Sequence, residues 1–252
     1  MLPPMHFLSV LLTTSSVLSA APGSPNTLCI GLHCGGQALG CENDASCKKV
    51  LDCSQACQSG NLTCSERCVT EYGTPKFDSL TVCIQNNNCI TPYPHKDYPT
   101  PTSSYSFTLD QFVGHWHVLY GLDKGLDCYD YQTMTISDLG NGDYNHDLQF
   151  VFPEGVKTIN STFTSQTPGH FGLDYTLGGG GHDNWYILGL NNDLLVVEYL
   201  GQNKLSNYRG GYVLRRDSFA PLTADETHQV DAVLVSAGTG LNFTQLCPLK
   251  SQ

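Results

Sequence analysis

Two side chains capable of acid–base chemistry stand close to aromatic residues in the second half of the chain. Asp183 follows four glycines and precedes Trp185, and Tyr199 comes later in the next predicted strand. Both lie at strand ends or edges, where polar side chains can face a barrel cavity. A carboxylic acid inside an apolar barrel suits proton donation, because desolvation raises its pKa. The alternatives are that Asp183 only ends a hairpin and that Tyr199 is a core aromatic.

A second group of polar candidates precedes these residues. It consists of Asp127, Asp130 and Gln132. The alternative for the two acids is that they are solvated loop residues. Trp116 and Trp185 are candidates for contact with an apolar ligand, and the competing interpretation is core packing.

The elements that must position these residues are short strands. From Phe107 onward, alternating polar and apolar residues are separated by turns rich in Gly, Asn and Asp. Eight such segments in sequence predict an up-and-down antiparallel barrel, the size that holds one small ligand. Residues 221–236 are expected to form a closing helix with Thr223 as its N-cap. The predicted strands are 115–120, 129–137, 143–152, 156–165, 170–176, 184–190, 194–200 and 208–216.

Twelve cysteines and an N-terminal leader indicate an oxidising compartment. The apolar run from Phe7 to Leu18 ends in small residues, which predicts a signal peptide over residues 1–21. Three sequons predict glycosylation at Asn61, Asn160 and Asn242. A metal site built from the C-x3-C pairs is disfavoured, because no histidine is interleaved between Cys41 and Cys89. The expected disulfide cysteines are Cys29, Cys34, Cys41, Cys47, Cys53, Cys57, Cys64, Cys68, Cys83, Cys89, Cys128 and Cys247.

Composition divides the mature chain into three parts. Residues 22–90 form a small cysteine-rich domain that needs disulfides for stability, with short helices expected over 46–56 and 63–71. The cysteines of these two helices would face each other across a hairpin, which predicts the pairs Cys53–Cys68 and Cys57–Cys64. Residues 91–106 form a proline-rich linker. Residues 107–252 form the barrel domain. The fold class is therefore mainly β, with a small α-helical disulfide-rich domain in front of the barrel.

Charge and hydropathy restrict the partners. The formal net charge is -11, and no basic stripe is present, which excludes nucleic acid as an expected partner. No segment after the leader approaches the ~20 apolar residues of a transmembrane helix. An apolar small molecule is the expected partner, and peripheral contact with a membrane is left open.

Several motifs resemble one family. Gly114-His115-Trp116, before seven further strands and a helix, resembles the lipocalin Gly-x-Trp motif. The cysteine spacing from Cys29 to Cys89 resembles the N-terminal domain of the violaxanthin de-epoxidase family, whose members are lumenal lipocalin-fold enzymes. The resemblance continues through Asp127, Asp130 and Gln132, the strand 183–188, Tyr199-Leu200-Gly201 and the glycine pair Gly210-Gly211.

The resemblance implies a lipocalin-like barrel and an activity. It implies that a carotenoid epoxide is reduced with ascorbate as co-substrate, and that no metal or nucleotide takes part. It makes Asp183 the proton donor assisted by Tyr199, with Asp127, Asp130 and Gln132 orienting the ring or the reductant. It also implies six disulfides, which pair residues 29–47, 34–41, 53–68, 57–64, 83–89 and 128–247.

The chain departs from the family pattern at several positions. Tyr131 stands where the family has its barrel cysteine, and Cys128 comes three residues earlier. Two histidines that follow the aspartate stretch in the plant enzyme are replaced by Met134 and Ser137, which removes groups that titrate near lumenal pH. Aromatic residues expected at two further positions are replaced by Gly181 and Arg215. No glutamate-rich extension follows the barrel in this sequence.

Two hypotheses therefore stand side by side. The first is an oxidoreductase of the violaxanthin de-epoxidase type. The second is a secreted lipocalin that carries an apolar ligand without chemistry, which the altered aromatics and missing histidines favour. An interaction module built on the cysteine-rich domain is a weaker third. The leader predicts the secretory pathway, with an extracellular or organelle-lumen destination; a thylakoid lumen fits if the source is an alga whose plastid is reached by that route.

Overall fold

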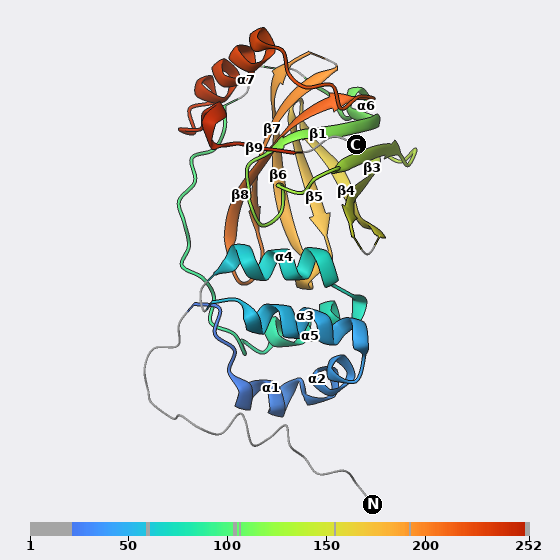
Figure 1. The fold of residues 1–252 in the computed structure, drawn as a ribbon, viewed down its shortest axis with the longest axis vertical. Helices are drawn as coiled ribbons and strands as arrows, with labels where there is room; N and C mark the ends of the chain where they lie inside the picture. Colours follow the sequence, from blue (N-terminus) through green and yellow to red (C-terminus); the bar gives the residue numbers. More distant parts are fainter. Residues whose placement is uncertain are drawn as a thin grey trace, which may run out of the picture.

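The computed structural model describes residues 22–249, apart from 59–60, 103–104, 106, 154 and 192. The predicted signal peptide, residues 1–21, lies outside the described residues. Figure 1 shows a helical unit stacked on one end of a β-barrel, with a further helix, α7, on the outside of the barrel. Within the described ranges, no helix has both the length and the apolar character that crossing a bilayer requires.

The helical unit contains short helices that begin at polar caps. Asp44 accepts hydrogen bonds from the backbone N–H of Ser46 and Cys47, and Asn61 accepts from that of Cys64. The predicted helices over 46–56 and 63–71 therefore form, each one residue longer at its start. The elements are α1 (Thr27–His33), α2 (Gly35–Glu42), α3 (Ala45–Ala56), α4 (Leu62–Tyr72) and α5 (Pro75–Asn86).

All twelve cysteines are paired, and three of the expected pairings need correction. The structure contains the expected bonds 53–68, 57–64 and 128–247. Instead of 29–47, 34–41 and 83–89, it pairs 29–89, 34–83 and 41–47. The physical reason is the unpredicted helix α5, which packs against α1 and α2 and brings Cys83 and Cys89 beside Cys34 and Cys29.

The strands form a closed antiparallel barrel, because β1 pairs with both β2 and β8. A short ninth strand, which we did not predict, adds to β1 at the Cys247 end of the chain. The elements are β1 (Gly114–Gly121), β2 (Thr133–Asp138), β3 (Asp143–Phe152), β4 (Gly155–Thr167), β5 (His170–Tyr175), β6 (Gly181–Leu190), β7 (Leu194–Gln202), β8 (Asn207–Arg216) and β9 (Cys247–Pro248).

The predicted strand over 129–137 begins four residues too early. Tyr131 has a φ of 58°, a left-handed conformation that ends extended structure, so β2 begins only at Thr133. The preceding loop is instead folded over the barrel mouth, with Asp127 completely buried. This difference matters for function, because it places a loop carboxylate inside the protein.

Helix α7 (Ala224–Ser236) packs on the outside of the barrel and is capped as predicted. The Thr223 side chain accepts from the Glu226 N–H, and the Glu226 side chain accepts from the Thr223 N–H. Val230 and Leu234 of α7 pack against outward-facing residues of β1, β6, β7 and β8. The inward faces form a separate, aromatic-rich core. Alternate residues of a strand thus pack either inside the barrel or against α7. The residues that point inward are available to form a site.

The end of the barrel away from the helical unit is closed by α6 (Leu109–Phe112). The indole N–H of Trp116 donates to the Phe112 carbonyl, and the Arg216 guanidinium lies over the Trp116 ring. Gly114 has a φ of 131°, and a Cβ there would lie 2.5 Å from Arg216. The Gly-x-Trp motif therefore plugs this end of the barrel.

The helical unit covers the opposite end of the barrel (Figure 1). Lys157 of β4 donates to the carbonyls of Val69 and Gly73, and Asp78 accepts from the backbone N–H of Gly178. Residues 91–102 contain no helix or strand and run from the helical unit up the side of the barrel towards α7. The cysteine-rich unit thus forms a lid over the mouth near β5 and β6.

Candidate active site

The first half of the site is the Asp183 carboxyl, which faces into the barrel from β6. The Tyr208 hydroxyl, from β8, donates to Asp183 Oδ1 over 2.6 Å. Gly201 of β7 lies between them in register, and a Cβ there would lie 2.1 Å from the Tyr208 ring and 2.4 Å from Asp183 Oδ1. Only a residue without a side chain leaves room for this hydrogen bond.

Tyr175 of β5 extends the same chain of polar groups. Its hydroxyl forms a hydrogen bond with the Tyr208 hydroxyl. Its register partner is Gly181, where a Cβ would lie 2.2 Å from the Tyr175 oxygen. The aromatic group that the family resemblance places at position 181 is thus missing from β6, and Tyr175 fills the space from the neighbouring strand.

The second half of the site is a completely buried carboxyl, Asp127, in the loop after β1. Tyr199 of β7 donates to its Oδ1 over 2.6 Å, and the backbone N–H groups of Asp123 and Gly211 donate to its Oδ2 over 2.9 Å each. Gly210, opposite Tyr199 in register, carries no Cβ that would meet the Tyr199 ring at 2.0 Å. Three donors make Asp127 a fixed acceptor.

One sequence pattern explains both halves. Tyr199-Leu200-Gly201 and Tyr208-Arg209-Gly210 lie on the antiparallel strands β7 and β8. In register, each tyrosine is opposite the glycine of the other strand, so the two phenol rings pass each other and reach different carboxyls. Tyr208 and Tyr175 were missed in the sequence analysis, and this paired Tyr-x-Gly pattern is the signal that finds Tyr208.

Aromatic rings of the barrel core pack beside the two acid–tyrosine pairs. Trp185 lies stacked on Tyr199, with centroids 5.5 Å apart and planes inclined by 15°, and Tyr212 lies 5.5 Å from Trp185. Phe163 packs edge-on to Trp185 from β4. Trp185, predicted as a ligand contact, therefore stands within the site.

Burial changes the protonation of both carboxyls. It raises the pKa of Asp183 to about 6, against a lowering effect of the Tyr208 hydrogen bond. It raises the pKa of Asp127 to about 7, where repulsion from Asp123 adds to burial and the hydrogen bond from Tyr199 opposes it. Each group therefore takes up a proton in mildly acidic solution, which suits a proton donor.

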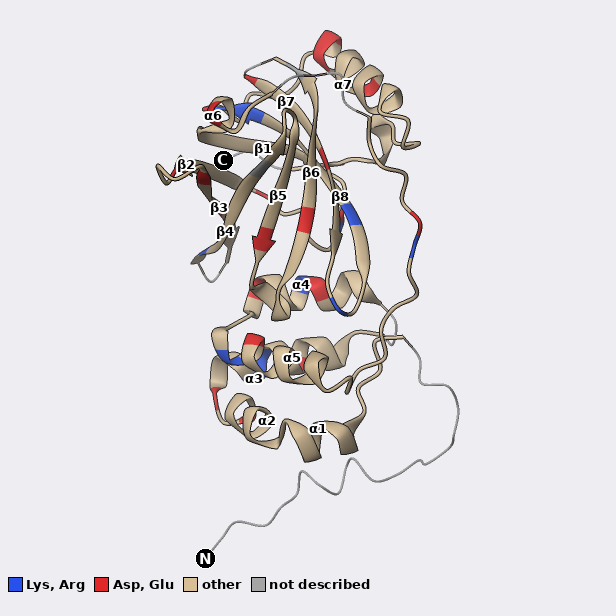
Figure 2. Ribbon diagram, turned by 180° about the vertical axis from the view of Figure 1, so that it is seen from behind, with Lys and Arg blue, Asp and Glu red and all other residues tan. Residues whose placement is uncertain are grey.

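The lid contributes a further acid from α4. Glu66 packs against Gly125 of the barrel loop, where a Cβ would lie 2.3 Å from Glu66 Oε2 and 3.2 Å from Asp123 Oδ1. Burial, together with repulsion from Asp123 and Asp127, raises the pKa of Glu66 to about 8. Figure 2 shows acidic positions on β5, β6 and α4 in the part of the molecule where barrel and lid meet.

The other predicted site residues lie in different parts of the barrel. Gln132 is completely buried, and neither polar atom of its amide has a partner among the described residues. Asp130 is half-buried in the same loop. Trp116 lies at the closed end of the barrel beside Arg216, at the opposite end of β8 from Tyr208, so the structure does not bring it to the site.

His146 of β3 is an interior polar residue that the sequence analysis missed. It is 1% exposed and lies between Phe163 and Trp185, with centroids 4.9 and 5.6 Å away. Neither ring nitrogen has a partner among the described residues, and burial lowers its pKa to about 4. His146 is therefore a neutral polar group on the inner wall.

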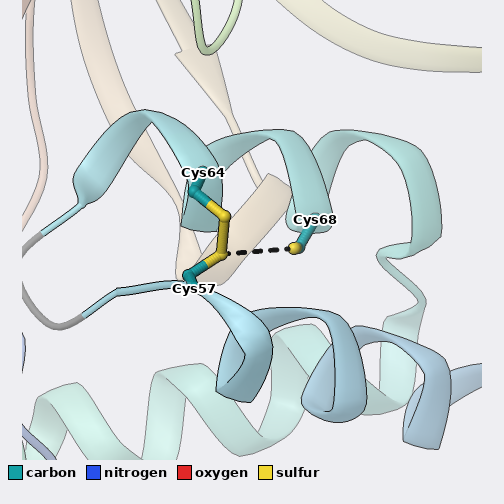
Figure 3. Close-up of side chains that lie close together, drawn as sticks. All are labelled: Cys57, Cys64 and Cys68. Carbon is teal, nitrogen blue, oxygen red and sulfur yellow. Dashed lines mark hydrogen bonds between the residues drawn. A yellow bond between two sulfur atoms is a disulfide. The ribbon is translucent and has the colours of Figure 1, made fainter.

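Three cysteine sulfurs gather in the lid, at Cys57, Cys64 and Cys68 (Figure 3). The sulfurs of Cys57 and Cys68 are 3.8 Å apart. However, Cys57 is bonded to Cys64, and Cys68 to Cys53. A disulfide sulfur offers no thiolate to a metal ion, so this cluster is two adjacent cross-links that tie α3 to α4.

Comparison with known proteins gives the family. The model of the VDE lipocalin domain matches residues 26–250. The chain belongs to this family. It is 24% identical over 225 residues to the chloroplastic violaxanthin de-epoxidase of Arabidopsis thaliana and 25% identical over 222 residues to that of Spinacia oleracea. These alignments cover 77% of the chain but only 46% and 45% of the relatives, so the chain spans less than half the length of the relatives that it matches.

A solved structure with a similar fold is that of insecticyanin from the tobacco hornworm Manduca sexta. The TM-score is 0.50 at 14% identity, with 64% of this chain and 88% of that chain covered. This likeness supports the lipocalin fold of the barrel. A lipocalin barrel is suited to a small apolar ligand.

Proposed function

We propose that the protein reduces the epoxide of a xanthophyll carotenoid, with ascorbate as the reductant and Asp183 as the proton donor. The observation that carries the proposal is the buried Asp183 carboxyl, which has a pKa raised to about 6 and lies in an aromatic-lined barrel. The family supports the substrate class, since the relatives are violaxanthin de-epoxidases.

The proposed reaction balances with groups at the site. Both C–O bonds of the epoxide break, a C=C bond forms, and the oxygen leaves as water after taking up two protons. Two electrons come from ascorbate, which becomes dehydroascorbate. Asp183 supplies one proton to the oxygen, and ascorbate supplies the other as it is oxidised. A barrel closed by the lid keeps bulk water from the intermediate. No step needs a metal or nucleotide.

The remaining site residues have supporting roles in this proposal. Both amide atoms of Gln132 lack a partner among the described residues and can bond to the ring or the reductant, and Asp130 lies in the same loop. Tyr199 acts with Asp127, its hydrogen-bond partner, and Trp185 forms the apolar wall. The six disulfides suit a secretory or lumenal compartment.

A second function is supported by a different observation. The fully buried Gln132 and His146 both lack partners among the described residues, and a bound polar group would satisfy them. Binding alone needs no acid chemistry, so the same barrel suits a secreted carrier of an apolar small molecule.

One experiment separates the two functions. The oxidised protein is incubated with violaxanthin in lipid, with and without ascorbate, at about pH 5 and about pH 7, and the pigments are separated by chromatography. Ascorbate-dependent formation of antheraxanthin and zeaxanthin supports the enzyme. Violaxanthin that remains unchanged and elutes with the protein supports the carrier and contradicts the enzyme.

A further inference from the structure

Three hydroxyl and carboxyl groups from three strands form one directed chain. Tyr208 has a single hydroxyl hydrogen, and it donates that hydrogen to Asp183 Oδ1. In the hydrogen bond between the two phenols, Tyr208 must therefore accept and Tyr175 must donate. The order is Tyr175 to Tyr208 to Asp183, with every hydrogen pointing towards the carboxyl.

We propose that Tyr208, supported by Tyr175, is a positioning residue that fixes the Asp183 carboxyl and sets the pH at which it takes up its proton. A donor that points at a carboxylate stabilises the ionised form. A second donor behind the first polarises it and strengthens the bond. Tyr208 therefore opposes burial, which favours the protonated form. Only the catalytic consequence of this inference rests on the proposed function.

Tyr208 is the main group that opposes the effect of burial on the pKa of Asp183. Burial raises the Asp183 pKa, and the Tyr208 hydrogen bond is the largest effect in the other direction, followed by the Trp185 side chain. His182 on the same strand lowers it and Asp174 of β5 raises it, but these two are bonded to each other on the outer face. The other titratable groups that face the chain are Tyr199 and Tyr212, which interact with Asp183, and Glu66 of α4, which faces Tyr175.

The backbone register makes the arrangement specific. Gly201 and Gly181 are the cross-strand partners of Tyr208 and Tyr175, and both lie where a Cβ would overlap the phenols. The two rings are thus held in place by strand pairing. Replacement of either tyrosine by phenylalanine keeps the ring and removes only the hydroxyl, which makes the test selective.

The test is a titration of the Asp183 carboxyl by difference infrared spectroscopy, with Asp183→Asn to identify its band. We expect Tyr208→Phe to bind the Asp183 proton about ten- to a hundredfold more tightly, which moves the titration about one to two pH units upward. Tyr175→Phe should move it in the same direction by less. Tyr144→Phe, whose hydroxyl bonds to Asp110 near the far end of the barrel, is the matched control and should leave it unchanged.

An unchanged or downward titration in Tyr208→Phe would overturn the inference. If Tyr208→Phe does not fold, the titration of Asp183 in Tyr175→Phe is the deciding measurement. The inference is then overturned if the Asp183 titration does not move to higher pH in Tyr175→Phe. In turnover assays, the pH profile of Tyr208→Phe should move upward by the same amount as the infrared titration. Absence of turnover in the wild-type protein contradicts the proposed function, whereas the infrared result tests the inference independently.

Discussion

Tyr199 donates its hydroxyl hydrogen to Asp127, which stands 72 residues earlier in the chain, and Tyr208 is the tyrosine that bonds to Asp183. We expected Asp183 to act with Tyr199. In the structure, each carboxyl has its own phenol, and Trp185 stacks on Tyr199, the phenol of the Asp127 half. The site is therefore two acid–tyrosine pairs at one barrel mouth, each with its own titration.

The Asp127 carboxyl should make stability depend on pH. Its pKa is about 7 in the folded protein and near 3.8 when unfolded. The folded state therefore binds the proton more tightly, and the free energy of unfolding should fall by up to about 4 kcal/mol as the pH rises from about 4 to 7. Asp127→Asn should lose this dependence in urea unfolding curves. Asp174→Asn, an exposed aspartate, is the control; an unchanged slope in Asp127→Asn would contradict the burial of the charge.

His146 should have the opposite effect at acid pH. Its pKa is about 4 when folded and 6.5 when unfolded, so the unfolded chain binds the proton more tightly. Stability should fall by about 3 kcal/mol as the pH drops from 6.5 to 4. His146→Leu should remove this loss and be more stable than wild type at about pH 4 in thermal melts. His228→Leu, on an exposed position of α7, should show no such gain; equal behaviour of the two variants would argue against a buried neutral histidine.

The glycines opposite the tyrosines should resist substitution. Gly201→Ala places a Cβ 2.1 Å from Tyr208 and 2.4 Å from Asp183 Oδ1, and Gly210→Ala places one 2.0 Å from Tyr199. Each should lower the free energy of unfolding by about 1–3 kcal/mol through overpacking. In Gly36→Ala, the Cβ in α2 meets nothing within 4 Å, and the change should stabilise by about 0.5–1 kcal/mol. If Gly201→Ala is as stable as the wild-type protein, the Tyr208 ring does not lie this close to Gly201.

Much of the fold followed from local sequence patterns. Alternation and Gly/Asn turns predicted eight strands, and Thr223, predicted as the N-cap, is the N-cap of α7. The folded loop before β2 did not follow, because its course depends on the φ of Tyr131 and on donors from Asp123 and Gly211, which are tertiary features. For the same reason Asp127 could be placed near the site but not inside it.

The helical unit was less predictable, because disulfide connectivity is a property of packing. Helix spacing was sufficient for α3 and α4, whose cysteines face each other. The packing of α5 against α1 is non-local, and it determines the partners of Cys29 and Cys34. Peptide mapping of the oxidised protein by mass spectrometry should find the pairs 29–89, 34–83 and 41–47. Recovery of peptides linked 29–47 and 83–89 would contradict this packing.

The acid dependence of the proposed reaction does not require the two histidines that are replaced by Met134 and Ser137. Asp183, with a pKa of about 6, is mostly ionised at about pH 7 and mostly protonated at about pH 5. As a proton donor it acts only in the protonated form. Turnover should therefore rise as the pH falls through about 6.

The most direct test of the proposed role of Asp183 is the rate of ascorbate-dependent de-epoxidation in Asp183→Asn, compared with wild type and with the control Asp225→Asn, at an exposed position of α7, at about pH 5. Loss of proton donation should lower the rate by at least about a hundredfold in Asp183→Asn, with the fold retained, while Asp225→Asn should keep the wild-type rate. Wild-type turnover in Asp183→Asn would contradict the assignment of Asp183 as the proton donor.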